Sequence, residues 1–115
     1  MSTGKFKDSV KRQKYKVGFE QKQRMKVLSL RNKFLGEWAS SILGLKETKM
    51  KVYVSNVMLS DYKKPNYENV IKKIEKDFIK KDIKISYREI EFKVKDFQMK
   101  ANVIIENKYK LDNKY

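Results

Sequence analysis

The side chains that most often carry enzymatic chemistry are scarce in this sequence. It contains no histidine and no cysteine, which excludes imidazole bases, thiol nucleophiles, disulfides and zinc-finger ligand sets. Ser40 and Ser41 have no histidine or acid in relay with them, and we expect them to face solvent or to bond back to the helix backbone. Glu89 and Asp96 would share a helix face, but each has a lysine four residues further on, so a catalytic carboxylate pair is not indicated.

The glycines give no sign of a phosphate-binding loop. The pattern GxxxxGK[ST] does not occur, and residues 14–18, which read KYKVG, do not match it. Gly36 falls in the middle of a predicted helix, where we expect it to allow the close approach of a neighbouring helix rather than to bind a ligand. Together with the missing nucleophiles and bases, this predicts a protein that is not an enzyme and holds no metal ion.

The composition indicates one basic domain. A chain of 115 residues can bury only a modest core, and its net charge of +15 is typical of proteins that meet nucleic acid, anionic membranes or acidic proteins. Only four of the 29 basic residues are arginine, the residue that nucleic-acid readers use most for bidentate contacts. Neither a secretory signal nor an apolar run of about 18 residues is evident, so we expect a soluble, intracellular protein.

The spacing of charges predicts helix along most of the chain. Nine of the 14 acids have a base four residues further on, where the two side chains share a helix face, against about three or four expected by chance. The pairs are Asp8 with Arg12, Glu20 with Arg24, Glu47 with Lys51, Glu68 with Lys72, Asp77 with Lys81, Glu89 with Lys93, Glu91 with Lys95, Asp96 with Lys100 and Glu106 with Lys110. The same pattern allows a simpler interpretation of the charges, as the solvated faces of helices.

The apolar residues recur three and four positions apart in four segments, at 27–43, 50–58, 67–78 and 87–104. Gly44 fits the C-terminal cap of the first, and Asn66, after Pro65, the N-terminal cap of the third. Ser86 and Glu89 form a capping box for the fourth. The second segment also alternates as a strand would, but we favour helix because no partner strand is evident.

These elements predict an all-α fold, a four-helix bundle preceded by a mobile, partly helical N-terminal arm. The arm, residues 1–20, is basic and offers only a narrow apolar face from Phe6, Val10 and Val17, interrupted by Gly18. We expect it to order against a partner. Residues 21–115 form the bundle, whose polar tail, from about Asn107, is expected to fray.

The stretch MKVLSLRNKFLGEWASSILGL resembles the signature of the zeta subunit family of bacterial F-type ATP synthases. The family's helix reads close to RRNKLLGLWAAELLG, and the helix-loop-helix spacing continues downstream through Asp61, Glu68 and the box at Ser86. The matching residues are Arg31, Asn32, Lys33, Leu35, Gly36, Trp38, Ala39, Leu43 and Gly44. The resemblance covers nearly the whole chain except about its last ten residues.

The resemblance implies a regulatory subunit whose arm enters the catalytic head of the ATP synthase, formed by its alpha, beta and gamma subunits, and blocks hydrolysis of ATP. By analogy the partner-binding residues are Phe6, Asp8, Val10, Lys11, Lys14, Tyr15 and Val17. The resemblance also implies weak binding of ATP or ADP at a site that the sequence does not locate. The expected location is cytoplasmic, peripheral to the inner membrane through the ATP synthase and not embedded in it.

Two alternatives stay open, a basic helical nucleic-acid-binding module and a general protein-interaction module. The charge and the basic arm favour the first. Against it, the aromatic residues Phe34, Trp38, Phe78 and Phe97 lie on apolar stripes, where we expect core residues rather than stacking platforms for bases.

Overall fold

Four helices make up the described part of the chain, which comprises residues 3–63 and 67–112 of a computed structural model, with side chains described for 20–61 and 67–111. They are α1 (Thr3–Ile42), α2 (Glu47–Lys63), α3 (Tyr67–Lys80) and α4 (Tyr87–Asp112). These ranges contain no strand, so the all-α class is confirmed and the ambiguous segment at 50–58 is helical. The proposed cap Asn66 and the adjacent Pro65 lie outside the described residues.

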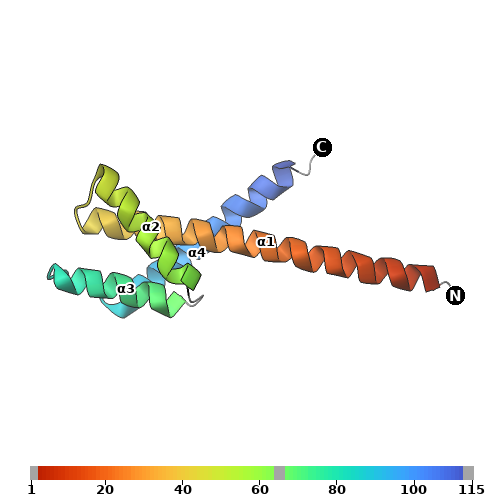
Figure 1. The fold of residues 1–115 in the computed structure, drawn as a ribbon, viewed down its shortest axis with the longest axis horizontal. Coiled ribbons are helices and arrows are strands. Elements are labelled where there is room, and N and C mark those ends of the chain that lie inside the picture. Colours follow the sequence, from red (N-terminus) through yellow and green to blue (C-terminus); the bar gives the residue numbers. More distant parts are fainter. Residues whose placement is uncertain (1–2, 64–66, 113–115) are drawn as a thin grey trace.

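α1 is much longer than the helical segment at 27–43 that the apolar spacing predicted. Its 40 residues correspond to about 60 Å of helix, and its N-terminal part extends away from the other three helices (Figure 1). The described part of the predicted arm, residues 3–20, therefore continues into the bundle without a break at residue 20. The helix passes through Gly18, because an interior glycine costs only about 1 kcal/mol and no proline interrupts α1.

The ends of α1 and α3 have the same backbone geometry. Gly44, with φ at 76°, donates its N–H to Ser41, and the N–H of Leu45 reaches the Ser40 carbonyl at 2.9 Å, which together form a Schellman motif. The predicted cap at Gly44 is confirmed. At the end of α3, Asp82 also has a positive φ, of 57°.

The start of α4 follows the predicted capping box on its serine side. The backbone N–H of Glu89 donates to the Ser86 hydroxyl at 3.2 Å, which satisfies one of the free amides of the first turn. At its other end α4 is helical to Asp112, past the point from which we expect the tail to fray.

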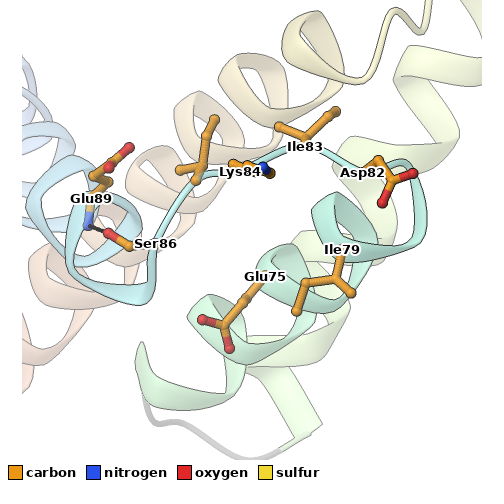
Figure 2. Close-up of a pocket in the computed structure, with 8 residues that line it drawn as sticks. Glu75, Ile79, Asp82, Ile83, Lys84, Ser86 and Glu89 are labelled. Carbon is orange, nitrogen blue, oxygen red and sulfur yellow. Dashed lines mark hydrogen bonds between the residues drawn. The ribbon is translucent and has the colours of Figure 1, made fainter.

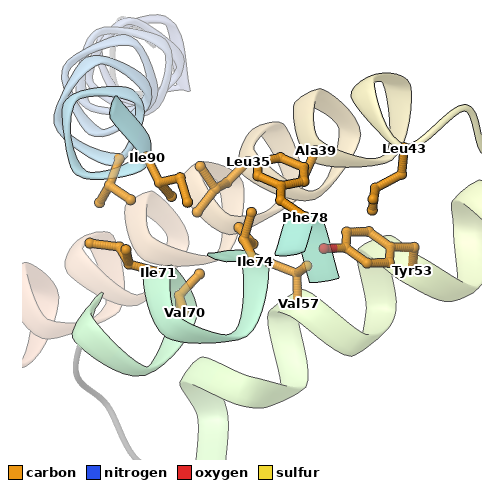
Figure 3. Close-up of a cluster of buried hydrophobic side chains, with 11 residues drawn as sticks. Leu35, Ala39, Leu43, Tyr53, Val57, Val70, Ile71, Ile74, Phe78 and Ile90 are labelled. Carbon is orange, nitrogen blue, oxygen red and sulfur yellow. The ribbon is translucent and has the colours of Figure 1, made fainter. Parts of the chain in front are cut away.

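The core lies between the helices, with α1 and α3 each packed against both α2 and α4 (Figure 3). α3 supplies the most strongly buried face, because its four core residues recur at spacings of one, three and four. The core residues are Leu35 and Ala39 of α1, Leu43 directly after it, Tyr53 and Val57 of α2, Val70, Ile71, Ile74 and Phe78 of α3, and Ile90 and Val94 of α4. The predicted bundle is thus confirmed.

Close packing of α1 on α2 depends on Gly36. A Cβ atom at this position would lie 2.9 Å from the Cα of Val54, a distance that real Cβ atoms do not adopt. Because the obstacle is backbone, rotation of the Val54 side chain could not relieve it. The predicted role of Gly36 in helix approach is therefore confirmed.

Aromatic side chains lie at the contacts of α1 with α3 and α4. Trp38 meets Phe78 edge to face, with ring centroids 5.7 Å apart, and Phe34 meets Phe97 at 5.9 Å. Phe78 is fully buried, and the other three are half-buried against the core. Ile104, which we predicted on the buried stripe of α4, is instead exposed, because the buried face of this helix ends at Ala101 and the half-buried Ile105.

Surface ion pairs form at the predicted pairs of Asp96 with Lys100 and Glu106 with Lys110. Asp96 lies 3.2 Å from Lys100, and Glu106 lies 3.6 Å from Lys110. The expected pairing of Asp77 with Lys81 is wrong. Asp77 pairs with Lys73 instead, and Lys81 donates to the carbonyl of Leu43 at 2.8 Å, tying the end of α3 to the end of α1.

Candidate functional site

The predicted partner-binding residues all lie on the part of α1 that extends beyond the bundle. Their backbone is helical, and their side chains lie outside the described residues. They are Phe6, Asp8, Val10, Lys11, Lys14, Tyr15 and Val17. On a helical backbone Phe6, Val10 and Val17 fall on one face of α1, and their role in binding a partner stays a prediction.

A buried polar cluster joins α1, α2 and α4 close to the level where α1 leaves the bundle. Asn32 donates from Nδ2 to Asp61 Oδ2 at 2.8 Å, and Arg31 donates from Nε to Asn32 Oδ1 at 3.0 Å. Arg31 also donates from Nη1 to Gln98 Oε1 at 3.2 Å, and its Nη2 lies 3.5 Å from Asp61 Oδ2. The cluster therefore fixes α1 against two neighbours at once.

The charge of Arg31 is balanced inside this cluster. Burial lowers the pKa of the Arg31 guanidinium from its ordinary value, and the Asp61 carboxylate opposes that effect. A buried charge is tolerated when it is both paired and hydrogen-bonded, and Arg31 meets both conditions. The cluster thus has a structural role, because it links α1 to α2 and α4. Its carboxylate, Asp61, is already engaged by Arg31 and Asn32.

Sequence reasoning used Arg31, Asn32 and Asp61 as marks of the family and missed that they touch. A signal was present, since Arg31 and Asn32 interrupt an apolar stripe that continues on both sides at Val27 and Leu35. A polar residue on a buried helix face requires a partner. That partner, Asp61, is 29 residues away in sequence, and spacing alone does not identify it.

A second polar cluster lies at the other end of the α2–α3 contact. Tyr53 donates its hydroxyl to Asp77 Oδ2 at 2.9 Å, and Lys73 donates to the same oxygen at 2.9 Å while its ammonium lies 5.2 Å from the Tyr53 ring. Burial raises the pKa of Tyr53 first, and the hydrogen bond to Asp77 and the charge of Asp77 raise it further. The tyrosine is thus held neutral as a hydrogen-bond donor.

Neither serine singled out in the sequence is part of a relay. Ser40 is fully buried and donates its hydroxyl to the Glu37 carbonyl at 2.9 Å, and Ser41 is exposed. Both expectations, bonding to the helix backbone and facing solvent, are confirmed, one by each serine. Asp96, one half of the possible carboxylate pair, is engaged by Lys100.

The cavities of the described structure are open surface hollows. One, of about 390 Å³, lies beside the loop between α3 and α4 and is lined by Glu75 and Ile79 of α3 and by residues 82–86 of the loop (Figure 2). Ser86 at its edge is used as the helix cap. Two others, of about 410 and 680 Å³, have mainly apolar walls. Among the described side chains, at 20–61 and 67–111, no group of three acidic residues could hold a metal ion.

The four aromatic residues that the sequence placed on apolar stripes pack within the fold. Phe78 is buried, and Phe34, Trp38 and Phe97 pack on one another, on Phe78 or beneath lysine side chains. Stacking platforms for bases are exposed rings along a basic groove, an arrangement that these four residues do not make. None of the helices, over the ranges described, is long and apolar enough to cross a membrane.

The fold and the clusters define a small all-helical protein in which one long helix extends from a bundle fixed by buried polar contacts. A family model of the ATPase inhibitor subunit zeta matches residues 1–103. The chain belongs to this family, whose name supports a regulatory, inhibitory role. No curated protein and no solved structure matches the chain.

Proposed function

We propose that this protein is a regulatory subunit of an F-type ATP synthase that inhibits ATP hydrolysis by inserting the N-terminal part of α1 into the catalytic head. Its contacts there would be with the alpha, beta and gamma subunits. The protein would act by binding, without catalysis of its own, in the cytoplasm and peripheral to the inner membrane.

The observation that carries the proposal is the continuity of α1. The helix begins at Thr3, and among its described side chains the first buried one is Val27, so 24 residues of α1 precede its first buried side chain. At about 1.5 Å per residue this part is about 36 Å long, enough to reach deep into a cleft between subunits.

The two parts of α1 differ in how they are stabilised. The C-terminal third of α1 is fixed by the core and by the Arg31 cluster, and the N-terminal part has only a narrow apolar face to bury. An isolated helix of this kind is marginal in water and gains stability when a partner covers that face. The bundle therefore holds the C-terminal part of α1 in place, and the partner would stabilise its N-terminal part.

The proposal is tested by titrating the catalytic head of the matching ATP synthase with the full chain and with a chain that starts at Gly18. We expect the full chain to inhibit ATP hydrolysis and the shortened chain to bind without inhibiting. Thermal unfolding of both chains controls for the bundle, which should melt at a similar temperature because its buried residues start at Val27.

Equal inhibition by both chains would contradict insertion of the arm, and absence of binding by both would contradict the partner. The weak binding of ATP or ADP implied by the family resemblance stays a prediction. Equilibrium dialysis of the full chain against labelled nucleotide tests it.

A further inference from the structure

The exposed apolar surface is concentrated on α4. Among the described residues, six of the eleven large apolar side chains that face solvent belong to this helix. Phe92 is 69% exposed, Met99 67% and Val103 56%. Spacings of seven and four residues place these three on one face, along about 16 Å of helix. An aligned set of this kind marks an interaction surface more often than scattered single residues do.

This face continues into a groove. A hollow of about 680 Å³ runs along α4 between Met99 and Val103 on one side and Phe97 and Ile104 on the other, and Phe34 of α1 closes it. Its walls are mainly apolar, and helix anchors spaced by four and seven residues suit such a groove. The core does not use it, because the buried stripe of α4 runs through Ile90, Val94 and Ala101.

Cations cover the rim of the groove. Lys100 lies 5.5 Å and Lys93 5.7 Å from the centre of the Phe97 ring, and Lys93 also lies 5.8 Å from that of Trp38. The one acid in the lining, Asp96, is paired with Lys100. An occupant with carboxylates beside its apolar face would therefore meet two ammonium groups close to Phe97.

The charge of the chain selects against a second copy as occupant. Two copies would bring a net charge of +15 each into contact, which opposes association at physiological salt. An acidic partner gains from the same charge.

We infer that the groove along α4 receives an acidic amphipathic helix of the partner protein. Resting on the proposed function, the inference assigns this helix to the catalytic head of the ATP synthase and makes the groove a second contact, separate from the arm. In this arrangement the arm inhibits ATP hydrolysis, and the groove determines the affinity of the bundle for the catalytic head.

The test measures binding of the full chain to the purified catalytic head by biolayer interferometry. Val103→Glu places a carboxylate in the groove, and Val52→Glu makes the same change at an equally exposed valine, 55%, on α2. We expect Val103→Glu to weaken binding about tenfold and Val52→Glu to change it less than about twofold. Val103→Lys should weaken binding less than Val103→Glu, because the partner is acidic. Lys100→Glu should weaken binding although it leaves the apolar walls intact.

Equal affinity of Val103→Glu and Val52→Glu would overturn the groove while leaving the arm proposal intact. Absence of binding by the unaltered chain would overturn both, and the two failures are thereby distinguished. A dimer in sedimentation that Val103→Glu dissociates would also overturn the inference, in favour of a second copy. Circular dichroism should show unchanged helix content in every variant, because all the altered residues are exposed.

Discussion

Asn32 of α1 donates to Asp61 of α2 across 2.8 Å, in a site where both residues are buried. The same carboxylate oxygen lies 3.5 Å from the Arg31 guanidinium. One acid thus satisfies both an amide and a buried cation, and it does so close to where α1 leaves the bundle. Stability of the bundle and direction of the arm consequently depend on the same contact.

Asp61→Ala is expected to destabilise the protein by about 3–5 kcal/mol, because it leaves the Arg31 charge buried without its partner. Urea unfolding followed by circular dichroism measures the change in the free energy of unfolding. Asp96→Ala is the matched control, since Asp96 forms a more exposed pair with Lys100 and should cost less than about 1 kcal/mol. Equal costs for the two variants would contradict the structural importance of the cluster.

Gly36→Ala tests the close approach of α1 to α2. Helix propensity alone predicts a gain of about 1 kcal/mol, but the added Cβ would lie 2.9 Å from the Val54 backbone, and overpacking of this kind costs about 1–3 kcal/mol. We expect a net loss of stability, measured as a lower melting temperature. Ser41→Ala, on an exposed site of the same helix, should be neutral or stabilising. If Gly36→Ala made the protein more stable, α1 and α2 would have to lie further apart than this close contact implies.

The sequence predicted the helices well wherever the signal was local. The apolar spacing located α3, the box at Ser86 located the start of α4, and Gly44 located the end of α1. The N-terminal extent of α1 was missed, because Gly18 and a sparse apolar face are weak arguments against helix when no proline intervenes.

The contacts between distant segments were beyond local reasoning. The Asn32 bond to Asp61 spans 29 residues, and the bond from Lys81 to the Leu43 carbonyl spans 38. Charge spacing assigned Lys81 to Asp77, which instead pairs with Lys73, one turn earlier on α3, and accepts from Tyr53 of α2 once these two helices pack. The exposed groove on α4 was missed because the spacing of Ile104 matches that of the buried residues of this helix. Only the structure shows that α4 has left the core at Ile104.

Tyr53→Phe should change how stability depends on alkaline pH. The pKa of Tyr53 is raised above its ordinary value of 10.0, chiefly by burial and also by Asp77, so the folded protein keeps a proton that the unfolded chain loses above about pH 10. The stabilisation is complete below pH 10 and declines as the pH rises further. We expect the variant to be less stable by about 1.5 kcal/mol at pH 8, and the difference to shrink toward pH 11.

Urea unfolding at pH 8, 9, 10 and 11 measures this difference, with Tyr67→Phe as the control for loss of an exposed tyrosine. Each comparison is made at the same pH and against the unaltered chain. A gap between Tyr53→Phe and the unaltered chain that stays constant from pH 8 to 11 would contradict the raised pKa.

Two substitutions at Gly18 test whether the helical form of the arm is the inhibitory form. Gly18→Ala should favour helix by about 1 kcal/mol, and Gly18→Pro should disfavour it by about 3 kcal/mol through the lost backbone hydrogen bond. If the catalytic head binds the arm as a continuation of α1, the alanine variant should inhibit ATP hydrolysis at about fivefold lower concentration, and the proline variant should need more than about tenfold more protein. Circular dichroism at 222 nm should rise for the first and fall for the second, while the thermal midpoint of the bundle stays the same. Equal inhibition by the two variants would show that the arm binds in another conformation, because their helical stabilities differ by about 4 kcal/mol.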